Sequence, residues 1–306
     1  DVETAFAMFN NYITRPYFDD EKNLNRFRKN NLKSLGRELS STTKFTRELT
    51  RSRYGDHPWM DYVDSTDLET LDMDFIKETF DRCFGNPEDM TLFICTDMNK
   101  DIIYPLVEKY VASLERTSEF KKANVKPMHP CYKGEVRLDK TYPLLSAPKV
   151  DVEYQFLAKA KDDAFHNAAY DILDYIMNAR CMNKIREERG GTYSVTFRTE
   201  FFPEGKIAES SIEFQTRPEM TDILVADAEQ LMAEMAADGP EKEEFDNACR
   251  YLAKRYNEQT ARNRNNLTKK MDAFMMKDKF GIDRQTDYLK ILDRTSRKDV
   301  KKMAKK

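Results

Sequence analysis

The sequence predicts an α+β fold in which a layered sheet carries helices on one face, preceded by a helical segment. Three observations predict it. Residues 149–157 alternate between apolar and polar side chains, which is typical of a half-buried strand. Residues 192–202 and 206–217 are also strand-like, and Pro203-Glu204-Gly205 joins them as a hairpin turn. Helical patterns cluster around these strands and do not alternate with them, which argues against a doubly wound sheet.

The first third of the chain is expected to be mainly helical. Apolar residues recur at helical spacing within residues 1–53, 67–84 and 99–114, and a short apolar strand is expected over residues 90–96. The segment from Tyr54 to Trp59 contains Gly and Pro, both of which end helices, so it is expected to form a loop.

A long helix is expected after the first strand of the sheet. Asp162 or Asp163 would cap it, and the helix would run to Arg189. Its expected apolar stripe consists of Phe165, Ala169, Ile172, Leu173, Ile176 and Met177. Two further helices are expected after the hairpin, one opened by Pro218 and ending at Asp238-Gly239, the other opened by Pro240.

An internal repeat indicates how the chain is organised. A charged helix, a second helix and Tyr54-Gly55 have a counterpart that starts at Gly239-Pro240 and ends at Phe280-Gly281. The offset of roughly 225 residues is too long for a solenoid and indicates duplicated domains. We therefore expect residues 1–84 to be the helical C-terminal part of one copy and residues 85–306 to be a complete second copy.

Composition narrows the functional classes. The 306 residues carry a net charge of -3, which gives no reason to expect nucleic-acid binding. No apolar stretch approaches the ~20 residues of a membrane span. Five scattered cysteines without a C-x-x-C pair argue against a disulfide framework and a thiolate zinc site. No signal peptide opens the chain, and its start at Asp1 suggests a piece of a longer polypeptide; the compartment is not assigned.

Metal-binding motifs are weak. The three histidines, His57, His129 and His166, are scattered, and neither H-E-x-x-H nor H-x-x-E-H is present. Residues 97–108 copy the spacing of a calcium loop, but Ile102 occupies the position where the sharp turn needs Gly. A helix N-cap at Asn99 or Asp101 explains the same residues.

The segment from Ile185 to Val195, with the sequence IREERGGTYSV, is the most informative one. Arg186 and Tyr193 are seven residues apart and separated by a glycine pair, so a sharp turn can aim both side chains at one point. A guanidinium and a phenol hydroxyl are suitable donors to a peptide carbonyl, or to the oxyanion it becomes. The alternative is a Gly-capped helix entering a strand, with Arg186 solvated or paired with Glu187 or Glu188 on the surface and the Tyr193 ring buried beside Val195 and Phe197.

Three stretches together resemble the pitrilysin/insulinase family of inverzincin zinc metallopeptidases. They are Tyr54-Gly55-Asp56-His57-Pro58, the passage FGNPEDMTLFICTDMNKD from Phe84 to Asp101, and the segment from Ile185 to Val195. The resemblance covers nearly the whole chain, and the last stretch is its most specific part.

The resemblance implies a fold and a role. Proteins of this family contain four homologous α+β domains in two halves, and the zinc motif lies in the first domain. The C-terminal half supplies an Arg and a Tyr that contact substrate beside the scissile bond, and Arg186 and Tyr193 match that pair in type and spacing. The chain would then be the C-terminal, substrate-binding part of a zinc endopeptidase that acts on peptides or unfolded proteins. Zinc would be bound by the N-terminal catalytic half of the same chain or by a partner subunit, and not by this fragment, which alone would be inactive.

Two other interpretations remain. The family includes non-catalytic members, so the chain can instead belong to a partner subunit or a peptide-binding scaffold. An unrelated α+β interaction domain remains only if the match at Arg186 and Tyr193 is accidental.

Overall fold

The computed structural model describes residues 1–18, 20–36, 39–117, 119, 128–141, 148–161, 163–202, 205–262, 267–268, 271 and 288–306. The chain forms two compact units. One comprises Asp1–Thr43 and Met60–Lys126, and the other comprises Lys44–Trp59 and Pro127–Lys306. Within the described ranges, no helix combines the length and the apolar character needed to cross a membrane.

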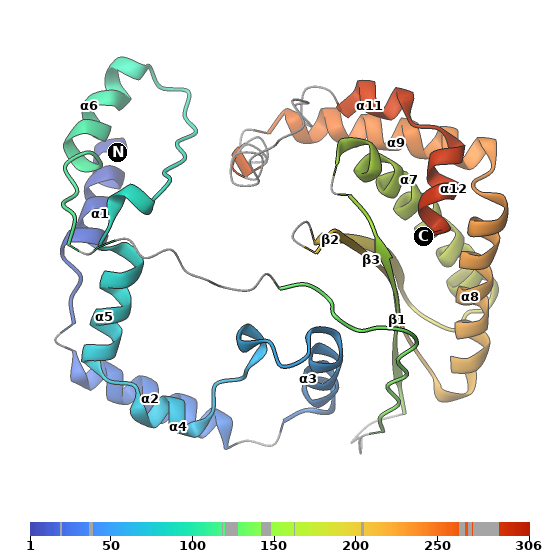
Figure 1. The fold of residues 1–306 in the computed structure, drawn as a ribbon, viewed down its shortest axis with the longest axis horizontal. Helices are drawn as coiled ribbons and strands as arrows, with labels where there is room; N and C mark the ends of the chain where they lie inside the picture. The colour runs from blue at the N-terminus through green and yellow to red at the C-terminus, as the bar shows by residue number, and fades with distance from the viewer. Residues whose placement is uncertain are drawn as a thin grey trace. The chain divides into compact units, whose positions relative to one another are not determined.

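Helices are the regular elements of the first unit within its described residues (Figure 1). Its elements are α1 (Val2–Thr14), α2 (Glu21–Leu35), α4 (Ser65–Thr70), α5 (Met73–Phe84), η2 (Pro87–Asp89) and α6 (Lys100–Tyr110). Side-chain oxygens cap the helices because the first backbone N–H groups of a helix have no partner within it. The capping residues of the five α-helices are Asp1, Asp20, Asp64, Asp72 and Asn99.

Two expectations for this unit were wrong. Residues 90–96 form no strand, because a strand needs a hydrogen-bonded neighbour and the described residues provide none there. The single helix expected over residues 67–84 is two helices, since the Asp72 side chain accepts a hydrogen bond from the backbone of Phe75 and starts α5 anew.

The second unit contains a three-stranded antiparallel sheet with the strand order β1-β3-β2. The strands are β1 (Val150–Lys159), β2 (Val195–Phe202) and β3 (Ile207–Thr216). Tyr154 on β1 and Phe197 on β2 both pair with Ile212 on β3, so one face of the sheet carries the apolar alternation seen in the sequence. The half-buried strand and the hairpin are therefore confirmed, while Pro203 and Glu204 of the turn lie outside the described residues.

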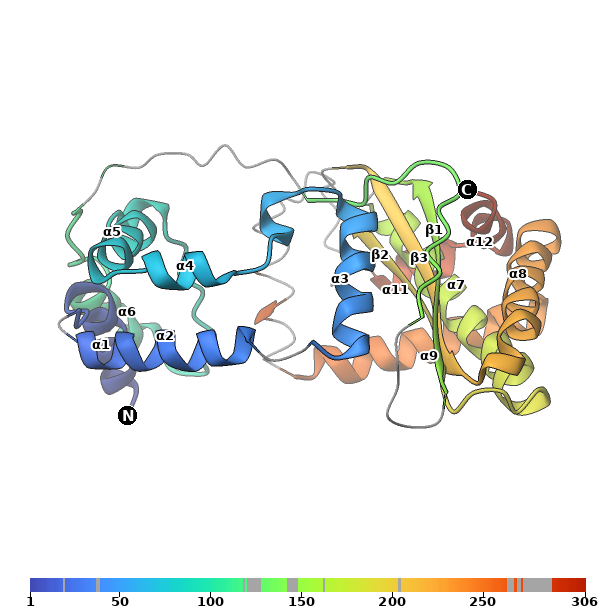
Figure 2. The same ribbon diagram turned by 90° about the horizontal axis from the view of Figure 1, so that it is seen from below.

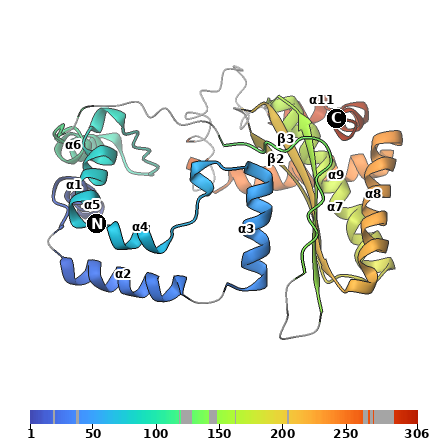
Figure 3. The same ribbon diagram turned by 60° about the horizontal axis from the view of Figure 1, so that its bottom comes forward.

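A layer of helices covers the apolar face of this sheet, which confirms the α+β class (Figure 2). The layer consists of α7 (Ala164–Cys181), η3 (Met182–Glu188), η4 (Pro218–Met220), α8 (Thr221–Asp238), α9 (Lys242–Thr260), α11 (Tyr288–Arg294) and α12 (Arg297–Ala304). Helix α7 is central, because Ile172 and Ile176 are fully buried between the sheet and the outer helices. Helix α3 (Ser41–Tyr54), followed by η1 (Pro58–Met60), lies on the opposite side of the sheet from this layer (Figure 3).

Three expectations for this unit need correction. The α-helix ends at Cys181 and continues as a π-helix, η3, instead of running to Arg189. Phe165 is not part of the buried stripe, because it is 44% exposed at the start of α7. Strand β2 begins at Val195 and not at Thr192, so the loop before it is longer than the sequence pattern indicates.

Polar side chains of α7 cover the outer edge of β2. Asn178 accepts a hydrogen bond from the backbone of Phe197 and donates one to it, at 2.9 and 2.5 Å. Asp174 accepts from the backbone and the hydroxyl of Thr199, at 3.0 and 2.7 Å, and the Ser210 hydroxyl lies 2.8 Å from that of Thr199. These bonds satisfy backbone groups that an edge strand would otherwise leave open.

Asp174 makes the stability of this unit depend on pH. Burial raises the pKa of Asp174 from 3.8 to about 7, although the hydrogen bonds from Thr199 oppose the shift. The folded state therefore holds the proton more tightly than the unfolded state. Its stabilising effect is complete below about pH 4 and is lost as the pH rises through about 7.

We expect the free energy of unfolding of the wild type, measured relative to Asp174→Asn, to fall by about 2 kcal/mol between about pH 5 and about pH 7. Asn cannot ionise and can still accept from the Thr199 amide. Urea unfolding at both pH values measures the difference, and Asp222→Asn, on the exposed first turn of α8, is the control. Equal pH dependence of the wild type and Asp174→Asn would contradict the role given to Asp174.

Candidate functional site

Arg186 lies in the π-helix that follows α7. Backbone bonds there reach five residues back, as in the bond from the Arg189 N–H to the Lys184 carbonyl at 3.2 Å. This winding turns the side chains away from the positions that a continued α-helix would give them. The Arg186 side chain is 41% exposed; its Nε lies 3.6 Å from the Glu187 carboxylate and its Nη1 donates to Met182 Sδ at 3.3 Å. An exposed ion pair of this length is worth about 0–1 kcal/mol, so a ligand can replace Glu187.

Tyr193 lies in the loop between η3 and β2, and its side chain is 88% exposed. Val195 and Phe197 are buried, at 4% and 1% exposure, but the alternation of the strand does not extend back to Tyr193, because β2 has not yet begun. The Tyr193 ring is therefore not buried beside Val195 and Phe197, which was the alternative that the sequence allowed. Its hydroxyl makes no hydrogen bond within the part of the chain that the structure describes.

The structure brings the two predicted residues together. The guanidinium carbon of Arg186 lies 5.7 Å from the centre of the Tyr193 ring, within the range of a cation–π contact. The pair lies at the open end of the β2–β3 hairpin, away from its turn. Both side chains are accessible to solvent, and both carry hydrogen-bond donors.

The backbone around this pair is tightly held. Gly190 adopts φ 61°, a left-handed conformation that suits glycine, and a side chain on Gly191 would lie 2.7 Å from a methyl group of Leu224. The Thr216 hydroxyl donates to the Gly191 carbonyl at 2.6 Å, and the Thr192 hydroxyl lies 2.7 Å from the Gln215 carbonyl. The loop is thus fixed to the end of β3, while Tyr193 points away from the core.

The residues considered for metals do not form a site. Among the described residues, no group of three or more His, Cys, Asp or Glu side chains could hold a metal ion. The His166 imidazole lies 2.8 Å from the Asp163 carboxylate, and the His57 ring lies edge-on to Trp59. Asn99 accepts from the backbone of Asp101 as the N-cap of α6, which explains the calcium-like spacing. The side chains described here therefore do not fit a zinc ion.

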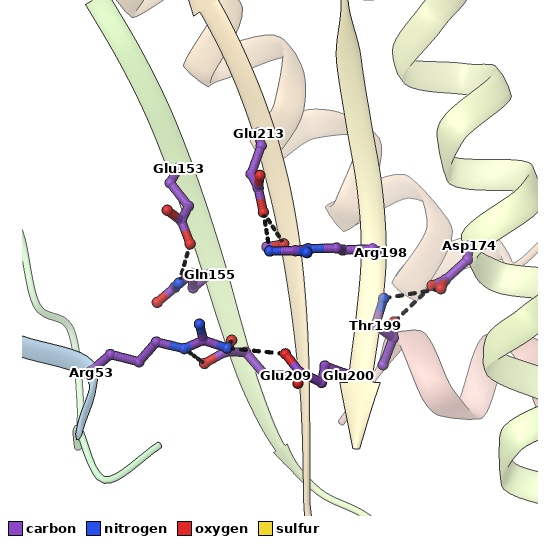
Figure 4. A network of polar contacts seen from close by, with 10 residues as sticks. Arg53, Glu153, Gln155, Asp174, Arg198, Thr199, Glu200, Glu209 and Glu213 are labelled. Atoms are coloured by element: carbon purple, nitrogen blue, oxygen red, sulfur yellow. Dashed lines mark hydrogen bonds and ion pairs between the residues drawn. The ribbon is translucent and has the colours of Figure 1, made fainter. Parts of the chain in front are cut away.

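A second cluster of charges lies on the sheet face opposite the helical layer (Figure 4). Arg53, from the end of α3, bonds to both carboxylate oxygens of Glu209 on β3 and lies 3.5 Å from Glu200 on β2. The Glu209 side chain is only 3% exposed, and burial raises its pKa even though the Arg53 guanidinium opposes the shift. This buried pair joins α3 to the sheet.

The same face carries a more exposed pair. Arg198 on β2 lies 2.9 Å from Glu213 on β3, and Glu153 on β1 pairs across from Glu213 in the register. Gln155 donates to Glu153, while burial raises the pKa of this carboxyl. Because the cations of this face already contact carboxylates, we interpret the cluster as structural.

One ion pair beside this loop could not be located from local patterns. Asp227 of α8 binds the guanidinium of Arg189 with both carboxylate oxygens, at 2.7 and 3.0 Å. One signal pointed to it, since Asp227 interrupts the apolar stripe of Leu224, Ala228 and Leu231. The sequence did not identify Arg189 as its partner, because the two residues are 38 positions apart.

Comparisons with known proteins agree with this fold. Residues 70–252, more than half of the chain, match the family described as Peptidase M16 inactive domain. This match includes both Arg186 and Tyr193. No curated protein matches the sequence.

Solved structures extend the likeness to the whole chain. The periplasmic protease PqqL from Escherichia coli has a TM-score of 0.83 at 18% identity, over 99% of this chain and 33% of that chain. The ferredoxin protease FusC, solved in complex with Arabidopsis ferredoxin, has a TM-score of 0.75 at 17% identity, over 100% of this chain and 33% of that chain. A peptidase M16 inactive domain from Pseudomonas fluorescens has a TM-score of 0.72 at 20% identity, over 99% of this chain and 72% of that chain. The chain spans about a third of the length of the first two proteins, and these identities show a common fold.

The Arg53–Glu209 pair should control the attachment of α3 to the sheet. Arg53→Met leaves a buried carboxylate without its partner, and we expect it to lower the free energy of unfolding by about 3–5 kcal/mol near neutral pH. The double variant with Glu209→Gln should regain most of this loss. Urea unfolding measures both effects. Arg198→Met, which breaks the exposed pair, is the control and should cost less than about 1 kcal/mol. Equal losses for the two Arg variants would contradict the assignment.

Proposed function

The chain belongs to the peptidase M16 inactive domain family, and we propose that it is the C-terminal, substrate-binding part of a zinc-dependent endopeptidase of the pitrilysin/insulinase type. The observation that supports this most directly is the exposed Tyr193 ring beside the Arg186 guanidinium on a tightly held loop. A large aromatic side chain with 88% exposure makes little contact with the core, which leaves its ring and hydroxyl accessible to a ligand.

The two donors suit a peptide bond that is being cleaved. The Arg186 guanidinium and the Tyr193 hydroxyl would both donate to the carbonyl oxygen of the substrate. As this oxygen gains negative charge, both hydrogen bonds strengthen, which favours the transition state over the bound substrate. Because the loop already holds the backbone in place, little reorganisation is needed at that moment.

The zinc ion of the proposed enzyme would lie outside this chain. The described side chains provide no suitable ligand group. In this proposal the N-terminal catalytic half of the same polypeptide, or a partner subunit, binds the metal and completes the active site. The substrate would be a peptide or an unfolded protein that can reach Arg186 and Tyr193.

The domain organisation belongs to the same proposal. Residues 1–84 would be the helical end of a preceding homologous domain, and residues 85–306 a complete copy. The similar endings of the two segments support this. Helix α5 follows the short helix α4 and starts at the N-cap Asp72, and α12 follows the short helix α11 and starts at the N-cap Ser296.

A non-catalytic role is the second candidate. The family description itself names an inactive domain, and such a domain can act in a partner subunit or a peptide-binding scaffold. In that case Arg186 and Tyr193 would bind a peptide carbonyl without its cleavage. Kinetics of the full-length protein separate the two candidates.

Loss of either donor should slow peptide cleavage by the full-length protein. We expect Arg186→Ala and Tyr193→Phe each to lower kcat by about 10-fold or more, as for lost oxyanion donors, without changing the melting temperature. Tyr251→Phe and Arg217→Ala, which alter other exposed side chains of the second unit, are the controls. Wild-type kinetics in both site variants would refute the assignment. Binding of peptide without cleavage, weakened in the same variants, would favour the non-catalytic role.

The chain of 306 residues alone should neither cleave peptides nor hold stoichiometric zinc, because its described residues lack a ligand group. Metal analysis by mass spectrometry after dialysis and a peptide-library assay measure these two properties. One tightly bound zinc ion per chain, or cleavage that a chelator abolishes, would contradict the proposal.

A further inference from the structure

An ion pair lies at the start of the loop that displays Tyr193. Arg189 follows η3 directly, and its guanidinium forms two hydrogen bonds with Asp227 of α8, at 2.7 and 3.0 Å. Parallel bonds between a guanidinium and a carboxylate fix the relative orientation of both groups as well as their distance. The ion pair therefore fixes the end of the π-helix relative to α8.

Asp227 occupies a position where a carboxylate is costly. Its side chain is 6% exposed, and it interrupts the apolar face of α8 between Leu224 and Ala228, both of which are buried. A charge in such a place is stable only when it is paired. Arg189, in contrast, is 42% exposed, so the carboxylate is the buried half of the pair.

The pair lies between the two segments that carry the proposed site. The Arg189 N–H bonds to the Lys184 carbonyl, and the Gly190 N–H bonds to the Arg186 carbonyl at 3.0 Å, so Arg189 ends the helix that carries Arg186. The loop to Tyr193 starts at the next residue. A change in the backbone conformation at Arg189 would therefore displace the segments that carry Arg186 and Tyr193.

We propose that Asp227 is the positioning residue of this site: through Arg189 it sets the orientation of Arg186 and Tyr193 toward the substrate carbonyl. Asp227 itself does not touch substrate. The inference rests on the proposed function for its catalytic consequence, but the ordering of the loop by Asp227 can be measured without any activity.

The first experiment measures loop order in the full-length protein. Tyr193→Trp places an indole on the loop, and Trp59→Phe removes the only tryptophan in this chain; any tryptophan elsewhere in the full-length protein is replaced by Phe as well. Time-resolved fluorescence anisotropy then reports the local motion of the indole. We expect Asp227→Asn to increase the amplitude of the fast anisotropy decay at least twofold.

The matched control is Glu244→Gln. Glu244 of α9 forms the same type of double hydrogen bond, with Arg180 of α7 at 2.8 and 2.7 Å, but does not contact the loop. It should leave the anisotropy decay unchanged. An identical decay in Asp227→Asn and Glu244→Gln would overturn the proposal.

The second experiment measures peptide cleavage by the full-length protein without the reporter changes. We expect Asp227→Asn to lower kcat about 10-fold with KM changed less than twofold, because misplaced donors weaken the transition state more than the bound substrate. In the Tyr193→Phe background, Asp227→Asn should lower kcat less than threefold further. If Asp227→Asn caused an independent structural defect, its full loss of about 10-fold would appear in that background as well. Glu244→Gln should keep wild-type kinetics.

The outcomes separate this inference from the proposed function. If Tyr193→Phe and Arg186→Ala cleave normally, the proposed function fails, and the anisotropy still decides whether Asp227 orders the loop. If those variants are slow but Asp227→Asn has normal kinetics and normal anisotropy, the inference fails alone. Should Asp227→Asn not fold, Arg189→Lys replaces it in both experiments, since it keeps the positive charge but loses the paired hydrogen bonds.

Discussion

The packing of α7 against the sheet is the constraint on which the rest of the second unit depends. Ile172 and Ile176 are fully buried, and so are Phe197 and Ile212 of the strands beneath them. Because side chains in a closely packed interior interdigitate, α7 cannot slide along the sheet and has one position on it. That position brings Asn178 and Asp174 to the edge of β2, and it places the end of the helix, where Arg186 follows, beside the start of the same strand.

Three largely buried carboxylates of this unit each join two elements. Asp174 links α7 to β2, Glu209 links the sheet to α3 through Arg53, and Asp227 links α8 to the loop after η3. Burial of a carboxylate is unfavourable, and each of these has its hydrogen-bond donors in place. Apolar packing determines which layers meet, and these few polar links determine how the less regular segments are attached to them.

The sequence predicted those features that repeat along the chain and missed those that depend on distant partners. Alternation over residues 149–157 predicts β1, and the hairpin follows from the two strand-like segments around a Pro-Gly turn. Residues 90–96 have the same apolar character but no neighbouring strand among the residues that the structure describes, which no local pattern can reveal. Arg186 and Tyr193 were found because both lie in one short segment. The Asp227–Arg189 pair was not, because its members are 38 positions apart, one on α8 and the other directly after η3.

The contrast between Tyr193 and the residues around it is the strongest structural reason to regard the segment as a site. Three contacts fix the loop beside Tyr193: Gly191 packs on Leu224, its carbonyl accepts from Thr216, and Thr192 bonds to β3. A loop with no role beyond connection would not need such fixation, since connecting segments ordinarily vary and move. Here the fixation leaves a single large side chain in solvent, beside a cation that has only a weak exposed partner. Order without burial is what preorganised recognition requires, because the entropy of positioning the donors is lost on folding and not on binding.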